Sequence, residues 1–335
     1  MDSIELQSQT PSSWLCAGPW SLLSTRREGE KSGRRDGPAG SLSGPRRGFH
    51  RRDFEFYRFR IRSRPNPPAQ WRKFLSLHVA DVLKGAPPLV VQLTWLSDGG
   101  ATLAAGFNHC LCDGIGGAEF LNSVSELARG LIELKRKPTW SRHLLDPGSR
   151  GPSRGYSASH PELRGVPDVC GFTSRYTREN LTPTLITFDK NRLSELKRLT
   201  GFTFTSFEVL SAHVWSSWAK ALNLTHNQIV KLIFSVNIRN RVMNPSLPSG
   251  YYGNDFVLGC ASMHAGELRG KGLGYAAELV KRAKERVGDE YVREVVDLVS
   301  STRASNVDSV GVLIMTQWSR FAVTNIVYCC RFVVV

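Results

Sequence analysis

The sequence predicts an α/β protein of about two domains, and three observations lead to that class. The chain has 335 residues, 41% of them hydrophobic, which is an ordinary globular composition with enough apolar mass for a large core. From about residue 70, short β-branched runs alternate with segments whose apolar residues recur at helical spacing. No stretch approaches the roughly 18 consecutive apolar residues that a membrane helix requires. The composition therefore excludes a membrane-spanning protein and a wholly disordered one.

Residues 1–67 predict a poorly structured basic extension. Residues 1–65 contribute +6 to the net charge of +15, and four Arg pairs lie there among Gly, Ser and Pro residues. Such a segment is typical of a nucleic-acid-binding arm, a transit peptide or a disordered extension, and we prefer the last interpretation. We therefore expect no nucleic-acid partner. The alternating sequence FEFYRFRI predicts a strand over Phe54–Ile61.

A β-hairpin followed by a glycine-rich turn and a helix is the clearest local pattern. After a helix-like segment, Trp71–Leu83, the run LVVQLTWL predicts a buried strand over Leu89–Leu96. The sequence DGG is a tight-turn signal, and TLAAGFN returns as a second strand over Thr102–Asn108. Apolar residues spaced three and four apart then predict a helix over about Ala118–Leu134.

The second half of the chain follows a long connection over residues 135–180, which are rich in Pro, Gly, Ser and Arg. Thr205 and Glu208 have the Thr-x-x-Glu spacing of a capping box, which predicts that an apolar helix over Phe207–Leu222 begins there. The other expected elements are strand Thr184–Phe188, helix Asn191–Leu199, strands Gln228–Asn237 and Tyr251–Leu258, helices Leu273–Val287 and Tyr291–Ser300, and strand Val310–Thr316.

The seven cysteines do not form a disulfide framework. Their number is odd, and two pairs, Cys110 with Cys112 and Cys329 with Cys330, are too close in sequence to bridge easily. Disulfides persist in oxidising compartments, so this pattern favours a reducing one. We expect a cytoplasmic protein.

His109 is the leading candidate for a chemical role. It ends the second hairpin strand, and Asp113 and three glycines follow within eight residues. Imidazole titrates near neutral pH, so His109 can act as a general base toward a hydroxyl or an amine. A metal site with Cys110, Cys112 and Asp113 is a second interpretation, although the spacing does not match the usual zinc patterns. A structural histidine in a turn is the third, and spacing alone leaves all three open.

Four segments, in the same order, resemble the BAHD acyltransferases, plant enzymes that transfer acyl groups from coenzyme A thioesters to alcohols or amines. HCLCDG is similar to the family's His-x-x-x-Asp-Gly motif, and TSFEVLSAHVWSSWAKAL to the helix early in its second domain. FSVNIRNRVMNPSLPSGYYGN resembles the Val-x-x-Arg-x-Arg segment and the Gly-Tyr-x-Gly-Asn stretch that follows it, and VLIMTQWSR resembles the Thr-Ser-Trp strand. The resemblance covers roughly residues 68–320.

The resemblance implies a chloramphenicol acetyltransferase-like fold of two α/β domains, each a mixed sheet flanked by helices, with the first domain incomplete. The implied divisions are a basic extension (residues 1–67), a partial N-terminal domain with the HxxxD motif (68–135), a crossover (136–182) and a C-terminal domain (183–335). The family's Asp-Phe-Gly-Trp-Gly ending is absent after strand Val310–Thr316, and residues 1–65 do not resemble the family's start. We expect a chain truncated, or altered by reading-frame errors, at both ends.

The same resemblance assigns roles to eight residues. His109 would be the general base. Asp113 would be structural and pair with an arginine, for which Arg239 is preferred over Arg241, and Gly114 would allow the turn. Thr316 and Trp318 would lie near the acyl carbonyl and the acceptor. Ser206 and Tyr252 would lie near the coenzyme A and acyl channel.

The implied reaction needs no metal and no permanently bound cofactor, because acyl-coenzyme A is a co-substrate. The stretch NHCLCDGIG is most similar to members that join hydroxycinnamoyl groups to hydroxy fatty acids or fatty alcohols, in cutin, suberin or wax formation. We therefore expect a monomer that acts on acyl-coenzyme A and a small alcohol, amine, fatty alcohol or hydroxy acid. The alternative is an inactive truncated relic or a non-catalytic binding protein.

Overall fold

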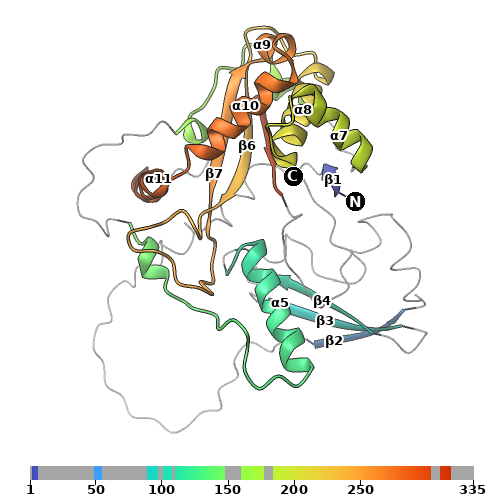
Figure 1. The fold of residues 1–335 in the computed structure, drawn as a ribbon, viewed down its shortest axis with the longest axis vertical. Helices are drawn as coiled ribbons and strands as arrows, with labels where there is room; N and C mark the ends of the chain where they lie inside the picture. The colour runs from blue at the N-terminus through green and yellow to red at the C-terminus, as the bar shows by residue number, and fades with distance from the viewer. Residues whose placement is uncertain are drawn as a thin grey trace. The chain divides into compact units, whose positions relative to one another are not determined.

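The computed structural model describes residues 2–6, 49–54, 89–96, 101–107, 109, 111–147, 160–176, 184–302 and 310–317 (Figure 1). The chain divides into a smaller unit, Ser24–Cys112, and a larger unit of Met1–Leu23 with Asp113–Val335. This division falls inside the 68–135 segment that is expected to be one partial domain, and the expected boundaries stay a prediction. Helix Trp71–Leu83 and most of strand Phe54–Ile61 lie outside the described residues.

The smaller unit contains a three-stranded mixed sheet in the order β2-β3-β4. The predicted hairpin is confirmed, because β3 (Leu89–Leu96) pairs antiparallel with β4 (Ala101–Phe107). On its other edge β3 pairs in parallel with β2 (Phe49–Phe54). β2 lies within residues 1–67, where the sequence suggests a poorly structured extension. His109 follows β4 by two residues.

The larger unit is built on a second mixed sheet, in the order β7-β6-β8. β6 (Ile229–Asn237) pairs antiparallel with β7 (Phe256–His264) and parallel with β8 (Val312–Met315). Because β6 is central, consecutive residues such as Leu232, Ile233 and Phe234 are all buried. A separate pair joins β1 (Asp2–Leu6) to β5 (Thr184–Phe188).

Helices cover this sheet and enclose the main core. α8 (Ser206–Ala221) packs on α10 (Gly272–Glu285), and α10 packs on β7. Trp215 on α8 is fully buried and belongs to the same hydrophobic cluster as Phe234 on β6. The remaining helices of the unit's second half are α7 (Lys190–Leu199), α9 (Ala265–Gly270) and α11 (Asp289–Thr302).

The capping box predicted at the start of α8 is present. The Thr205 hydroxyl accepts a hydrogen bond from the Glu208 amide at 3.4 Å, and the Glu208 carboxylate accepts one from the Thr205 amide at 2.8 Å. Two otherwise unpaired amide groups are satisfied in this way. Glu208 also forms an ion pair with Lys284, which joins α8 to α10.

Two predicted elements are present but begin several residues away from their predicted starts. Helix Ala118–Leu134 is α5 (Gly114–Ala128), which begins early because Asp113 caps it; Gly130, at φ +87°, lies just beyond its end. Strand Tyr251–Leu258 is β7, which begins only at Phe256. The stretch before Phe256 instead forms a loop, in which the Gly253 carbonyl accepts the Asp113 amide at 3.1 Å.

The expected crossover at 136–182 contains short helices of its own. They are η3 (Arg142–Leu145), η4 (Pro161–Leu163) and α6 (Phe172–Tyr176). Thr139 also forms a bridge with Tyr251, through a 2.8 Å bond from the Thr139 amide to the Gly250 carbonyl.

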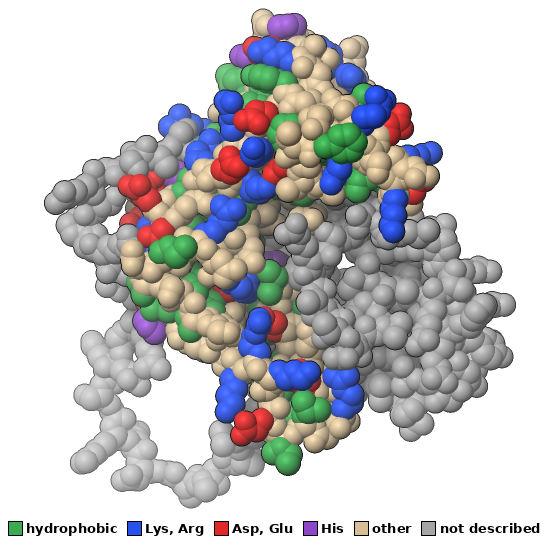
Figure 2. Space-filling view, viewed as in Figure 1, with side chains coloured by type: hydrophobic (Ala, Val, Ile, Leu, Met, Phe, Trp, Pro, Cys, Tyr) green, Lys and Arg blue, Asp and Glu red, His purple; other side chains and the backbone are tan. Residues whose placement is uncertain are grey.

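Charged side chains of both signs share the surface of the described chain. Figure 2 shows Lys and Arg side chains lying among Asp and Glu. Some form helical pairs four residues apart, such as Lys271 with Glu267 at 2.6 Å and Arg282 with Glu278 at 2.7 Å. Within the residues described, no helix is long and apolar enough to cross a membrane.

Candidate functional site

His109 lies in a turn of the smaller unit, just after β4, and is half-buried. The strand ends at Phe107, so the chain leaves the sheet before it reaches the imidazole. Residues at such strand ends are commonly presented to ligands. Three residues separate His109 from Asp113, which is the first residue of the larger unit's second segment.

Asp113 holds the start of α5. Its backbone is extended, at φ −79° and ψ −177°, and its Oδ1 accepts a hydrogen bond from the Gly116 amide at 2.9 Å. Asp is among the preferred residues at this position because its carboxylate satisfies an amide that has no partner within the helix. Gly114 is the first residue of the helix, where the sequence analysis expects a turn glycine.

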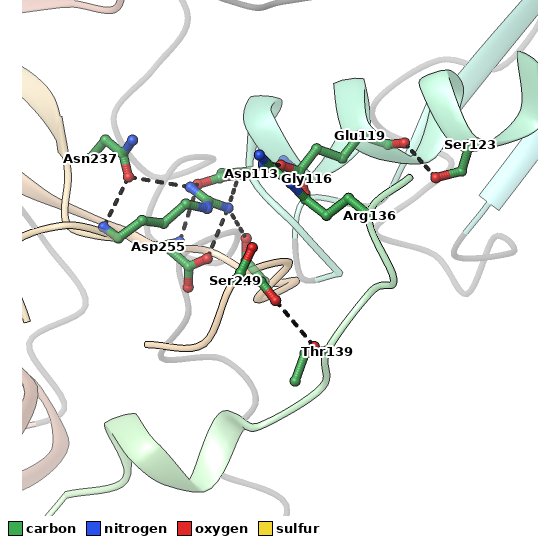
Figure 3. Close-up of polar contacts among 11 residues, drawn as sticks. Asp113, Gly116, Glu119, Ser123, Arg136, Thr139, Asn237, Ser249 and Asp255 are labelled. Atoms are coloured by element: carbon green, nitrogen blue, oxygen red, sulfur yellow. Dashed lines mark hydrogen bonds and ion pairs between the residues drawn. The ribbon is translucent and has the colours of Figure 1, made fainter. Parts of the chain in front are cut away.

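Arg239 pairs with both oxygens of the Asp113 carboxylate (Figure 3). Nη1 donates to Oδ2 at 2.8 Å and Nη2 donates to Oδ1 at 2.9 Å. Two parallel bonds of this kind are strong and fix the orientation of the carboxylate. The expected pairing of Asp113 with Arg239 is therefore present, across 126 positions of sequence.

Arg241, the second candidate, has a different partner. Its Nη1 donates to the carbonyls of Lys284 at 3.0 Å and Val287 at 2.5 Å, at the end of α10. The last carbonyls of a helix have no partners within it, and basic side chains commonly bond them. Arg241 therefore closes α10 and does not pair with Asp113.

Asp255 is a third member of the Asp113–Arg239 cluster and is not among the site residues predicted from the sequence. Its Oδ2 lies 2.8 Å from Nη2 of Arg239, and its amide donates to Oδ2 of Asp113 at 3.1 Å. Figure 3 shows Asp255 and Asp113 at the same cluster, although 142 positions of sequence separate them. The signal in the sequence is a single acidic residue directly before the apolar run FVLGCA, where a charge needs a buried partner.

Burial and charge set the ionisation of this cluster. Burial raises the pKa of Asp255 to about 8; the positive charge of Arg239 opposes this rise, and the negative charge of Asp113 adds to it. Burial acts to lower the pKa of Arg239, but its hydrogen bonds to Asp113 outweigh that effect, so the pKa is raised above its ordinary value. Arg239 is therefore always cationic, and Asp255 is the member that titrates near neutral pH.

The other expected site residues lie on separate elements of the larger unit. Ser206 begins α8, Thr316 directly follows β8, and both are half-buried. Tyr252 lies in the loop before β7, where its ring is 6.0 Å from that of Trp140. It also neighbours Gly253, whose carbonyl accepts the Asp113 amide. Trp318 lies outside the described residues.

A second buried polar cluster was not expected from the sequence. Nδ1 of His160 is 3.0 Å from Glu162, and Nε2 is 3.1 Å from Glu294 on α11. The hydroxyl of Tyr291 donates to the same Glu162 oxygen at 2.5 Å. Burial acts to lower the pKa of His160, but hydrogen bonds to both carboxylates raise it overall. Through these contacts, His160 and Glu162 of the crossover segment bind Glu294 and Tyr291 of α11.

His109, Cys112 and Asp113 lie close together in sequence and are all potential metal ligands. Across the described ranges, no group of three or more His, Cys, Asp and Glu side chains is arranged to hold a metal ion. Cys112 is buried and forms no disulfide, and the Asp113 oxygens are occupied by Arg239 and backbone amides.

Comparison with known proteins gives a family and a fold. The Transferase family model matches residues 56–329. The chain is 35% identical over 266 residues to omega-hydroxypalmitate O-feruloyl transferase of Arabidopsis thaliana, covering 77% of this chain and 57% of that protein. It is 36% identical over 236 residues to fatty alcohol:caffeoyl-CoA acyltransferase of Arabidopsis thaliana, covering 70% and 54%.

Among solved structures, the crystal structure of vinorine synthase aligns with a TM-score of 0.57 at 18% identity, covering 82% of this chain and 62% of that one. At that identity the likeness concerns the fold, and it confirms the expected two-sheet α/β architecture. The chain spans a little over half the length of the two curated relatives.

Proposed function

Because the chain belongs to the Transferase family of BAHD acyltransferases, we propose that it transfers an acyl group from a coenzyme A thioester to an alcohol or amine, with His109 as general base. The observation that carries the proposal is the bidentate Asp113–Arg239 pair. The pair fixes the orientation of Asp113, which lies four positions beyond His109 and caps α5. A general base needs a defined position, since proton transfer depends on geometry, and we propose that the anchoring of Asp113 contributes to it.

The reaction has a simple balance of atoms. The neutral imidazole of His109 accepts the acceptor's proton as the acceptor oxygen or nitrogen attacks the thioester carbonyl. A tetrahedral intermediate forms, the carbon–sulfur bond then breaks, and the proton passes to the departing thiolate. Both substrates are consumed, and the acylated acceptor and free coenzyme A are released, within one cycle, so no bound cofactor and no covalent enzyme intermediate are required.

Thr316 and Trp318 are proposed to lie near the acyl carbonyl and the acceptor. A hydroxyl at the end of β8 can donate to the oxygen that becomes negative in the intermediate. Donors aimed at such developing charge commonly contribute more than any other single catalytic effect. Ser206 and Tyr252 are proposed to contact coenzyme A or the acyl chain, from the start of α8 and the loop before β7.

A hydroxycinnamoyl donor with a fatty alcohol or hydroxy fatty acid acceptor is the substrate pair that we propose. It is supported by the names of the two relatives, one a feruloyl transferase and the other a caffeoyl-CoA acyltransferase. Pocket walls decide substrates independently of fold, so this pair is the first of a panel to be tested. We further propose that the protein acts as a monomer and lies in the cytoplasm. The location is supported by Cys170 and Cys260, which form no disulfide.

The test is an acyl-transfer assay with the full 335-residue chain, feruloyl-, caffeoyl-, benzoyl- and acetyl-coenzyme A, and long-chain alcohols, hydroxy fatty acids and amines. Turnover with at least one pair is expected. His109→Ala should lower kcat by a factor of about 100 to 10,000 while thioester binding changes little. His143→Ala, at an exposed histidine, is the matched control and should keep full turnover.

Two results would overturn the proposal in different ways. Equal turnover in the His109→Ala variant and the unaltered chain would remove the histidine from the mechanism. Tight binding of acyl-coenzyme A without turnover of any pair would favour a non-catalytic binding protein.

A further inference from the structure

One guanidinium serves two buried carboxylates in the larger unit. Nη2 of Arg239 lies 2.9 Å from Oδ1 of Asp113 and 2.8 Å from Oδ2 of Asp255. The Asp255 side chain has no exposed surface, and that of Asp113 is 9% exposed. With both acids ionised, the cluster would hold one uncompensated negative charge away from water, which is strongly unfavourable.

The two carboxylates are not equally supported. Asp113 accepts hydrogen bonds from the amides of Gly116 and Asp255, and from both terminal nitrogens of Arg239. Within the part of the chain that the structure describes, neither carboxylate oxygen of Asp255 accepts a hydrogen bond, and its ion-pair partner is Nη2 of Arg239. Hydrogen bonds to the charged form favour ionisation. A proton placed in the cluster therefore belongs on Asp255, the carboxylate with fewer hydrogen bonds.

Charged groups from several packed elements face Asp255. They are Arg239 after β6, Asp113 and Glu119 at the start of α5, Arg142 in η3, and Tyr251 in the loop before β7. The guanidinium of Arg142 lies over the Trp140 ring at 3.6 Å, and Glu119 is paired with Arg136 at 2.5 Å. Arg239 is therefore the cation for which ionised Asp255 would compete.

We propose that Asp255 is a positioning residue: as a neutral acid it leaves Arg239 to Asp113, and when ionised it draws the guanidinium away and loosens the start of α5. The consequence for catalysis rests on the proposed function, because it acts through the turn between His109 and Asp113. The shared atom is Nη2, which cannot shorten its contact to Asp255 without weakening its bond to Asp113. Alkaline loss of activity is the expected result.

The first experiment compares Asp255→Asn with the unaltered chain over pH 6 to 9.5. Asn keeps the shape of the neutral acid and cannot ionise. With a pKa of about 8, roughly nine-tenths of Asp255 is ionised at pH 9, so kcat of the unaltered chain should fall by up to about tenfold from its value at pH 7. The Asp255→Asn variant should keep its kcat at pH 9. Glu133→Gln, at an exposed acid beyond the end of α5, is the matched control and should retain the alkaline loss.

A second measurement does not need turnover, so it separates failure of this proposal from failure of the proposed acyl transfer. Hydrogen exchange over Gly114–Gly117 should be faster in the unaltered chain than in Asp255→Asn at pH 9, and equal at pH 6.5. If Asp255→Asn does not fold, infrared spectroscopy of the unaltered chain replaces it. A protonated carboxyl band present at pH 6.5 and lost at pH 9.5 supports the proposal. Matching exchange at pH 9, or no such band at pH 6.5, overturns it.

Discussion

Removing Arg239 should destabilise the protein more than removing Asp113, although the two residues form one pair. Arg239→Ala leaves the carboxylates of Asp113 and Asp255 buried without their cation. Loss of one partner from a buried pair costs about 3–5 kcal/mol, because the remaining charge is uncompensated. We therefore expect Arg239→Ala to lower the free energy of unfolding by about 4 kcal/mol.

Asp113→Ala removes different interactions. The Gly116 amide loses its cap, which costs about 1 kcal/mol. The Asp255 amide loses its acceptor, for about another 1 kcal/mol or more. Arg239, however, keeps Asp255 at 2.8 Å, and loss of the neighbouring negative charge favours ionisation of Asp255. The expected cost is about 2–3 kcal/mol, below that of Arg239→Ala.

Urea denaturation at pH 7.5 measures both costs, with fluorescence of the fully buried Trp215 as a reporter in the same unit. Arg136→Ala is the matched control, because its ion pair with Glu119 is largely exposed and should contribute less than about 1 kcal/mol. An Asp113→Ala variant that is less stable than Arg239→Ala would refute the role given to Asp255 as the second partner.

Three further changes test other parts of the structure. Thr205→Ala should cost about 1 kcal/mol by urea denaturation, because the amide of Glu208 loses its cap; no change would mean that the capping box is dispensable. The raised pKa of His160 contributes stability that is complete below pH 6.5 and is lost as pH rises through the higher folded-state pKa, so His160→Gln should reduce that alkaline decline; parallel pH profiles would contradict it. Gly250→Ala should lower Tm by several degrees, since φ is +80° and a Cβ would lie 2.2 Å from the Lys137 carbonyl oxygen; an unchanged Tm would show that the bridge to the crossover yields easily.

The elements that could be predicted from sequence are those that local signals define. The hairpin of β3 and β4 follows from two β-branched runs around a DGG turn, and the start of α8 follows from a capping box within four residues. α5 and β7 begin several residues away from their predicted starts, for different reasons. The Asp113 cap begins α5 early, and apolar spacing alone does not show a cap. The loop before β7 is decided by contacts distant in sequence, to Asp113 and Ile238.

The buried polar clusters were harder to predict for the same reason. His160 and Glu294 are 134 positions apart, and a His-Pro-Glu sequence within a long connection carries no sign of that contact. Asp113 and Arg239 are separated by 126 positions, and their pairing was expected only because the surrounding motifs resemble a known family. Family resemblance supplies long-range contacts that periodicity cannot, but only for positions that its motifs include.

The choice between Arg239 and Arg241 shows what packing adds to such a motif. Both arginines follow β6 and lie two residues apart, so the sequence gives each the same local signal. Arg241 is taken by the carbonyls that end α10, at Lys284 and Val287, and a guanidinium bonded there is not available to Asp113. That leaves Arg239 as the cation of the cluster, and it also explains why Asp255 has to share it. The cluster therefore has one cation for two buried acids, and protonation of one acid would keep it neutral.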